Sequence, residues 1–434
     1  MSFQILTRDV PPRSAWTLEQ AGIHPLLSRL FAARGIQSAD ELDDGLAKLL
    51  PPNTLKGTEA AANLLADAIA AQKRLCIVAD YDCDGATACA VGLRGLRMLG
   101  AQHVSYIVPD RVVDGYGLTA PIAKRVQQSG ADVLITVDNG IASMEGVAEA
   151  QSLGLQVLVT DHHLPAATLP SADVIVNPNQ PGCSFESKAL AGVGVMFYVL
   201  LALRAELRKR GLFTAETQPK LDALLPLVAL GTVADVVKLD NNNRRLVAQG
   251  LKRIRAGAMP SGMLALFKAA GRDARVATTF DFGFALGPRI NAAGRIGNAA
   301  MALTLLTTED KGEASHIAQE LERLNRERQE IELAVVDQAM VQADAMLGKE
   351  RRGTVLVVSA KGWHPGVVGL AAARLKLPPL VGYLIAGMLI GPHTPGFVAD
   401  MELASQLAEI GVMLLMFGVG LHFSLRDLLS VKTI

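Results

Sequence analysis

The sequence of 434 residues is long enough for two or three domains with substantial cores. Its 42 basic and 42 acidic residues give no net charge, which excludes a global basic field that would attract nucleic acid. The four cysteines form no CxxC pair, as is typical of a reduced cytosolic protein, and residues 1–16 have no apolar run that would predict a secretory signal.

Residues 15–73 are expected to form short helices, interrupted at Pro51 and Pro52, and we predict an N-terminal helical region over residues 1–70. Short apolar runs then alternate with helical stretches. This alternation of strand-like and helical segments predicts an α/β fold with a doubly wound parallel sheet, within a domain spanning residues 71–305. The predicted strands cover residues 75–79, 104–108, 133–137, 157–160 and 174–176.

Three alternating acids follow the first predicted strand, and the rest of the chain is arranged around them. Asp80, Asp82 and Asp84 precede Gly85 at the point where a buried parallel strand turns into its crossover helix. Ligands bind at the carboxyl ends of such strands, and three crowded carboxylates favour divalent cations among them. Because Asp and Gly are also common turn residues, a polar turn is the alternative interpretation.

Further polar residues occur where later apolar runs end. Asp138 follows the third run, Asp161, His162 and His163 follow the fourth, and Asp235 follows an apolar stretch over residues 224–230, interpreted as another strand-type run. Each alone has a structural explanation, as a turn residue, a loop or a helix cap. Together they predict one binuclear metal site at a shared edge of the sheet.

Four segments resemble the successive motifs of the DHH phosphoesterase superfamily, and within it the RecJ-type single-strand-specific exonucleases of bacteria. These segments are Asp80-Tyr-Asp-Cys-Asp-Gly85, Val137-Asp-Asn-Gly140, Asp161-His-His163 and Gly231-Thr-Val-Ala-Asp235. The resemblance continues through residues 287–295 and 362–369 and covers about residues 1–375. It implies 5′ to 3′ degradation of single-stranded DNA with Mn²⁺ or Mg²⁺, in recombination and repair.

The resemblance also implies a division of roles among the polar residues. Asp82 would bind one metal with Asp80 beside it, and Asp84, His162 and Asp235 would bind the other. Asp138 would bridge both cations and act in catalysis, with His163 next to the reacting phosphate. Val78 stands where some relatives have a histidine, which implies a looser hold on the first metal. Carboxylates with one imidazole suit Mn²⁺ or Mg²⁺ better than a structural zinc.

A separate set of residues resembles the substrate contacts of the family. It consists of Arg111, Tyr116, Arg289, Asn291 and Arg295. The arginines would steer the DNA backbone or its 5′ end. For Tyr116, packing against the sheet is the alternative to stacking on a base. Since aromatic residues form only 4% of the chain, recognition is expected to depend mainly on the nucleic-acid backbone.

Beyond the sheet domain, helical spacing with many charges predicts one long helix over residues 313–347, inside a connecting segment of residues 306–350. The apolar run 354–359 then opens a second α/β domain, expected to be truncated and to cover residues 351–376.

The composition of the remaining residues changes abruptly. Residues 377–399 carry no charged side chain, and residues 410–425 contain only uncharged groups and His422. The stretches 379–392 and 411–423 resemble the N-terminal helices of Kef-type cation:proton antiporters. This resemblance predicts an apolar membrane-type helical tail over residues 377–434, and a buried core hairpin is the alternative.

The predicted function is therefore that of a metal-dependent single-stranded DNA exonuclease, impaired by truncation. The alternatives are a phosphoesterase acting on short oligonucleotides or polyphosphate, and an inactive membrane-attached fusion that carries an antiporter fragment. The expected partners are two Mn²⁺ or Mg²⁺ ions and single-stranded DNA, with no nucleotide cofactor. The expected location is the bacterial cytoplasm, with membrane contact through residues 377–434.

Overall fold

The computed structural model describes residues 8–110, 113–347, 360 and 363. The chain divides into two compact units, residues 1–322 and residues 323–434. The sheet and all of the predicted metal ligands belong to the first unit.

Short helices precede the sheet, as the sequence predicts. Three of them begin with proline, which is preorganised for the first helical position. Ala15, Leu18, Ala32 and Ile36 form a small core between α1 and α2. The helices are α1 (Pro12–Gln20), α2 (Pro25–Ala32), η1 (Ala39–Leu42), η2 (Leu46–Lys48), η3 (Pro52–Thr54) and α3 (Thr58–Ala70).

The predicted parallel sheet is confirmed. Its strands are β1 (Leu75–Ala79), β2 (Val104–Ile107), β3 (Val133–Val137), β4 (Gln156–Thr160) and β5 (Val174–Val176). They are hydrogen-bonded in the order β2-β1-β3-β4-β5, and every pairing is parallel. The order reverses between β1 and β3, and ligands bind beyond the carboxyl ends of the strands at such a switch point. Ala79 pairs with Val137, and Val137 with Thr160, so the residues that follow these strands lie along one edge.

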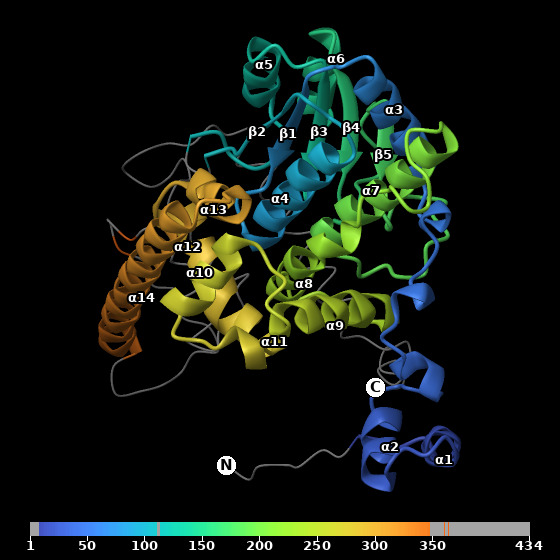
Figure 1. The fold of residues 1–434 in the computed structure, drawn as a ribbon. Helices are drawn as coiled ribbons and strands as arrows, with labels where there is room; N and C mark the ends of the chain where they lie inside the picture. Colours follow the sequence, from blue (N-terminus) through green and yellow to red (C-terminus); the bar gives the residue numbers. More distant parts are fainter. Residues whose placement is uncertain (1–7, 111–112, 348–359, 361–362, 364–434) are drawn as a thin grey trace, which may run out of the picture. The chain divides into compact units, whose positions relative to one another are not determined.

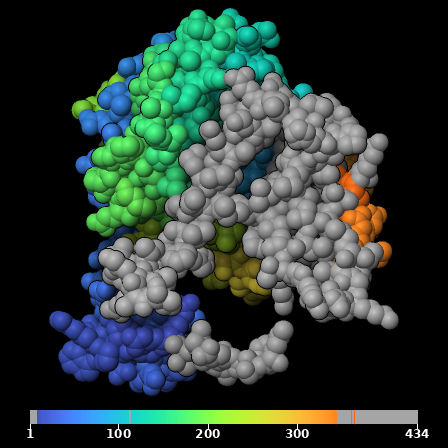
Figure 2. Space-filling view, turned by 180° about the vertical axis from the view of Figure 1, so that it is seen from behind, coloured from blue at the N-terminus to red at the C-terminus, as the bar shows by residue number. Residues whose placement is uncertain are grey.

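Helices cover both faces of the sheet (Figure 1). On one face, α5 (Ala120–Gln128) and α6 (Met144–Ser152) pack through Ile122, Val126 and Val147 onto inward-facing strand residues such as Leu134 and Val157. On the other face lie α3, α4 (Cys83–Met98) and α7 (Gly192–Lys209). The teal and green surface at the top of Figure 2 belongs to the segment that contains α5 and α6.

A helical region follows the sheet in sequence. One sequence interpretation is wrong here: residues 224–230 are not a strand-type run, because Leu224 ends the 3₁₀ helix η4 and residues 225–230 lie in an α-helix. This helix, α8, is buried on nearly all sides, so it is apolar all round and shows no helical periodicity. The elements are η4 (Leu221–Leu224), α8 (Leu225–Ala234), α9 (Asn241–Arg255), α10 (Ser261–Ala269), η5 (Ala274–Val276), α11 (Thr279–Asp281), the π-helical turn η6 (Phe282–Leu286), α12 (Gly287–Ile296) and α13 (Ala299–Thr307).

The predicted long helix is confirmed as α14 (Lys311–Leu347), which at 1.5 Å per residue is about 55 Å long. The predicted second α/β domain, apart from residues 360 and 363, and the predicted tail over residues 377–434 lie outside the described residues. Within the part of the chain that the structure describes, no helix combines the length and the apolar composition that a bilayer crossing requires.

Candidate metal centre

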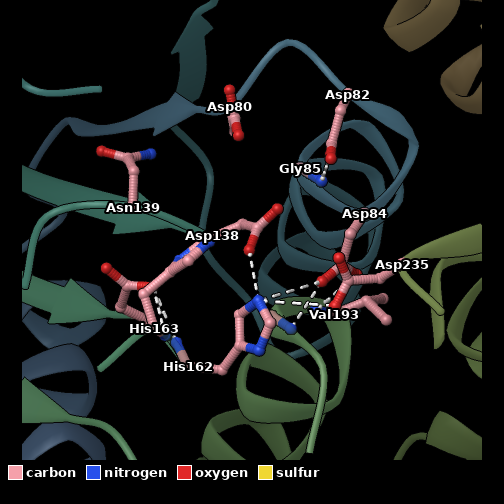
Figure 3. A network of polar contacts seen from close by, with 12 residues as sticks. Asp80, Asp82, Asp84, Gly85, Asp138, Asn139, His162, His163, Val193 and Asp235 are labelled. Carbon is pink, nitrogen blue, oxygen red and sulfur yellow. Dashed lines mark hydrogen bonds and ion pairs between the residues drawn. The ribbon is translucent and has the colours of Figure 1, made fainter. Parts of the chain in front are cut away.

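Polar side chains from several elements converge beyond the carboxyl ends of β1, β3 and β4 (Figure 3). Asp80 follows β1, Asp138 follows β3 and His162 lies two residues after β4. Asp82 and Asp84 come from the start of α4, and Asp235 is the residue at which α8 ends. Potential ligand atoms lie within 4.8 Å of one another in three groups: Asp80, Asp82 and Asp138; Asp84, His162 and Asp235; and Asp138, His162 and His163. We call the six residues Asp80, Asp82, Asp84, Asp138, His162 and Asp235 the metal centre.

The imidazole of His162 lies at the middle of this cluster. Its Nε2 is 3.1 Å from Oδ1 of Asp138, 3.5 Å from Oδ2 of Asp235 and 3.9 Å from Oδ2 of Asp84. The Asp138, His162 and Asp235 atoms are buried and make no hydrogen bond. The Asp138 and Asp235 oxygens both lie close to Nε2 of His162. Because a buried polar atom without a partner is costly, such a set of neighbouring atoms fits a bound cation. Carboxylate oxygens with one imidazole form a donor set for a hard divalent ion.

The first turn of α7 holds the carboxylate of Asp84. The backbone N–H of Gly192 donates to Oδ2 at 2.6 Å, and that of Val193 donates to Oδ1 at 3.0 Å. A Cβ on Gly192 would lie 2.6 Å from Oδ1 of Asp138, and a Cβ on Gly231 would lie 2.9 Å from Oδ1 of Asp84. Glycine is therefore required at two points where helices approach the carboxylates. No local sequence pattern indicates the role of Gly192, because its contacts come from distant segments.

The Asp80–Gly85 turn is stabilised by local hydrogen bonds between its carboxylates and its backbone N–H groups. Asp82 caps α4, since its Oδ1 accepts a hydrogen bond of 2.9 Å from the N–H of Gly85. Oδ1 of Asp80 accepts from the N–H of Tyr81 at 2.6 Å. A Cβ on Gly85 would lie 2.6 Å from the Asp80 carbonyl oxygen, so the strand can turn this tightly into α4 only with glycine there.

Two residues of the site have left-handed backbone conformations. Asp138 has φ of 62°, and Val236, which follows Asp235, has φ of 61°. Asp tolerates this region, but for a β-branched residue it is strained. Such strain is typical of functional sites, where the surrounding structure holds the backbone in place.

Burial and mutual repulsion make the carboxyl groups hard to ionise. Burial, with the charge of Asp82, raises the pKa of Asp80 to about 7 and that of Asp235 to about 7. Burial also raises the pKa values of Asp84 and Asp138 well above the usual range, helped by neighbouring carboxylates. A divalent cation would favour the charged forms of all of these groups.

The two histidines differ in charge because of their surroundings. Burial and the neighbouring His163 lower the pKa of His162 to about 4, so the imidazole is neutral at neutral pH and one of its ring nitrogens has a lone pair. Burial opposes protonation of His163, but Asp161, whose Oδ1 is 2.7 Å from Nδ1, raises the pKa of His163 to about 9. His163 is therefore a cation whose side chain is 48% exposed, and it can donate to an anionic group.

The residues predicted to contact the substrate have different partners in the structure. The Tyr116 hydroxyl donates to the carbonyl oxygen of Asp138 at 3.3 Å, and its ring meets those of Tyr81 and His163 edge-on. Arg289 pairs with Glu322 at 2.6 Å. Oδ1 of Asn291 accepts from the N–H of Cys83 at 2.7 Å, and Arg295 is the next-to-last residue of α12. Arg111 lies outside the described residues.

The parallel sheet with acids and a histidine at its switch point defines a protein of the DHH class. In agreement, residues 74–232 match the DHH family, N-terminal domain. The single-stranded-DNA-specific exonuclease RecJ of Haemophilus influenzae is 48% identical over 355 residues, covering 81% of this chain and 62% of the relative. RecJ of Dickeya dadantii is 43% identical, covering 89% of this chain and 68% of the relative. The chain belongs to the RecJ family.

A solved structure agrees with this assignment. The crystal structure of Thermus thermophilus RecJ in complex with Mn²⁺ matches with a TM-score of 0.71 and 34% identity, over 84% of this chain and 51% of that one. The chain spans 62% to 65% of the length of the first curated RecJ relatives that it matches.

The end of the chain has a different similarity. Residues 365–433 match the family described as sodium/hydrogen exchanger, transmembrane. A segment of 68 residues is 66% identical to the putative cation/proton antiporter YbaL of Escherichia coli, and it covers 12% of that protein.

Proposed function

We propose that this chain is a metal-dependent exonuclease that hydrolyses phosphodiester bonds of single-stranded DNA in the 5′ to 3′ direction. The observation that carries the proposal is that buried oxygens of Asp138 and Asp235, which make no hydrogen bond, lie 3.1 and 3.5 Å from the buried Nε2 of His162. The RecJ relatives, named for single-stranded DNA, and the Mn²⁺ and Mg²⁺ complexes of Thermus RecJ support the substrate and the cofactors.

The residues of the metal centre would hold two Mn²⁺ or Mg²⁺ ions, with Asp138 between them. When bound, a pair of such ions supplies an activated water and neutralises charge on the reacting phosphate. Asp84 needs no reorganisation to act as a ligand, because α7 already fixes both of its oxygens. His162 is neutral and can offer its lone pair.

His163 would bind the substrate and not the metal. Its Nδ1 is engaged with Asp161, which leaves Nε2 free to donate to a phosphate oxygen. Charge on the imidazole, which Asp161 favours, strengthens that hydrogen bond. The Tyr116 hydroxyl donates to the backbone carbonyl of Asp138, and the ring contacts that of His163. Tyr116 can therefore form part of the same wall of the substrate site.

The test is degradation of single strands labelled at either end by the full chain with Mn²⁺. We expect shortening from the 5′ end, no reaction in EDTA and none with Asp138→Ala. Activity that survives Asp138→Ala would contradict the proposal. Cleavage restricted to short oligonucleotides or to polyphosphate would support the alternative substrate class.

We further propose that residues 377–434 attach the chain to a membrane. The support is the exchanger-family match over residues 365–433 and the identity with an antiporter segment. Flotation of the full chain with liposomes tests this proposal. Recovery of all of the protein in the soluble fraction without detergent would contradict it.

A further inference from the structure

Two phenylalanine rings in the segment that precedes α12 are exposed to solvent. Phe280 is 56% exposed and Phe284 is 73% exposed, although phenylalanine usually buries most of its surface. Their rings stack with centroids 4.7 Å apart and an angle of 27° between the planes. Phe284 lies in the π-helical turn η6, a local geometry that is frequent at functional sites. An exposed aromatic pair of this kind is a candidate contact surface.

The segment that carries these rings, α11 and η6, continues directly into α12, which contacts residues next to the metal ligands. A Cβ on Gly287 would lie 3.2 Å from Cβ of Ala234, the residue before the last ligand of the centre. Further along α12, Asn291 accepts a hydrogen bond from Cys83, which lies between two other ligands. Phe284 is seven residues before Asn291, so it lies about 10 Å from that point along the helix axis. A strand bound at the metal centre would reach it within a few nucleotides.

The surrounding sequence has an excess of basic residues. Residues 252–289 contain seven basic and two acidic residues, although the whole chain is neutral. Four of the seven form ion pairs with Asp222, Asp273, Asp281 and Glu322, so the local excess of positive charge comes from Lys252, Arg255 and Lys268. The guanidinium carbon of Arg272 lies 6.0 Å from the centroid of the Phe280 ring. Arg272 thus contacts Phe280, and Phe280 stacks on Phe284, the more exposed of the two rings. The basic residues are Lys252, Arg253, Arg255, Lys268, Arg272, Arg275 and Arg289, and the acidic ones are Asp273 and Asp281.

We propose that Phe284, supported by Phe280, is a stacking platform for a base of the single strand being degraded. The proposal rests on the proposed function and adds a substrate contact outside the metal centre. Stacking on an aromatic face suits a nuclease without sequence preference, because every base has a π face. The local positive charge would hold the adjacent phosphates and make binding sensitive to salt.

The test compares binding of a labelled oligothymidylate to the full chain in a mild detergent, with EDTA present to prevent hydrolysis. We expect Phe284→Ala to weaken binding about tenfold, within the range for loss of one base–aromatic stack. Trp16→Ala is the matched control, because Trp16 is a comparably exposed aromatic residue (62%) on α1 and should bind as wild type does. Phe284→Trp should retain affinity, and its fluorescence should be quenched when the oligonucleotide binds.

Mn²⁺ binding separates this proposal from the proposed function. Phe284→Ala should bind Mn²⁺ as tightly as wild type, because no ligand is changed. Wild-type affinity for oligothymidylate in Phe284→Ala, or no quenching in Phe284→Trp, would overturn the platform while leaving the exonuclease assignment intact. If the variant instead converts a dimer to a monomer, the rings face a second copy of the chain and the platform is also overturned. Absence of Mn²⁺-dependent cleavage by wild type would count against the proposed function itself.

Discussion

The backbone nitrogen of Gly192 lies 2.6 Å from Oδ2 of Asp84, which joins the first turn of α7 to the metal centre. The same glycine leaves no room for a side chain, because a Cβ would lie 2.6 Å from Oδ1 of Asp138. One residue therefore orients one carboxylate by a hydrogen bond and makes space for another. The geometry of the centre depends on this backbone as much as on its ligands.

Gly192→Ala should disrupt the centre without altering any ligand. We expect a cost of about 1–3 kcal/mol in the free energy of unfolding from overpacking, and an affinity for Mn²⁺ lowered about 10- to 100-fold. Calorimetric titration with Mn²⁺ and thermal unfolding measure the two effects. Gly283→Ala is the control, because a Cβ there would make only an ordinary contact, 4.0 Å from Cγ1 of Val233. Equal Mn²⁺ affinity in the two variants would show that Gly192 has no positioning role.

We expect Asn291 to stabilise the Asp80–Gly85 turn, which carries three of the proposed metal ligands. Asn291→Ala removes the acceptor for the N–H of Cys83, which we expect to cost about 1 kcal/mol of stability, as for a lost helix cap. Asn291→Asp keeps an acceptor and should retain Mn²⁺ affinity. If Asn291 instead contacts DNA, Asn291→Ala will weaken oligonucleotide binding while thermal stability and Mn²⁺ affinity stay unchanged.

Affinity for Mn²⁺ should rise with pH. Protons compete with the cation for Asp80 and Asp235, whose pKa values are raised to about 7, and for Asp84 and Asp138, whose pKa values are raised further. His162 has its pKa lowered to about 4, so it adds no competition near neutrality. Titrations between pH 5.5 and 8 should show tighter binding at each step, with protons released. An affinity for Mn²⁺ that does not depend on pH over this range would contradict the raised pKa values of these carboxyl groups.

His163→Gln should separate phosphate binding from metal binding. The substitution removes the positive charge that Asp161 stabilises, so we expect KM for single-stranded DNA to rise at least about tenfold. Mn²⁺ affinity should stay at the wild-type value. A parallel loss of Mn²⁺ affinity would instead make His163 a ligand, which its position near Asp138 and His162 also permits.

The elements that follow local patterns could be predicted from the sequence. The strands are apolar runs, and the acids that follow them mark the switch point because parallel strands end at one edge of the sheet. The helix α8 could not be recognised, because burial on nearly all sides removes its periodicity. The roles of Gly192 and Asn291 depend on contacts about 110 and 210 residues away in the chain, which no local pattern contains. The ion pair of Arg289 with Glu322 is long-range in the same way.

The most direct test is the number of Mn²⁺ ions bound per chain, measured by calorimetric titration of the full chain and of Asp138→Asn. We predict two ions in wild type, because Asp80, Asp82 and Asp138 form one set of potential ligands and Asp84, His162 and Asp235 form another. Asp138 lies between the sets, with its Oδ1 3.1 Å from Nε2 of His162. In the variant this proposed bridging ligand is weakened, so we predict loss of at least one ion together with loss of cleavage. Wild-type protein that binds no Mn²⁺, or a variant that still binds two ions with unchanged affinity, would contradict the binuclear centre.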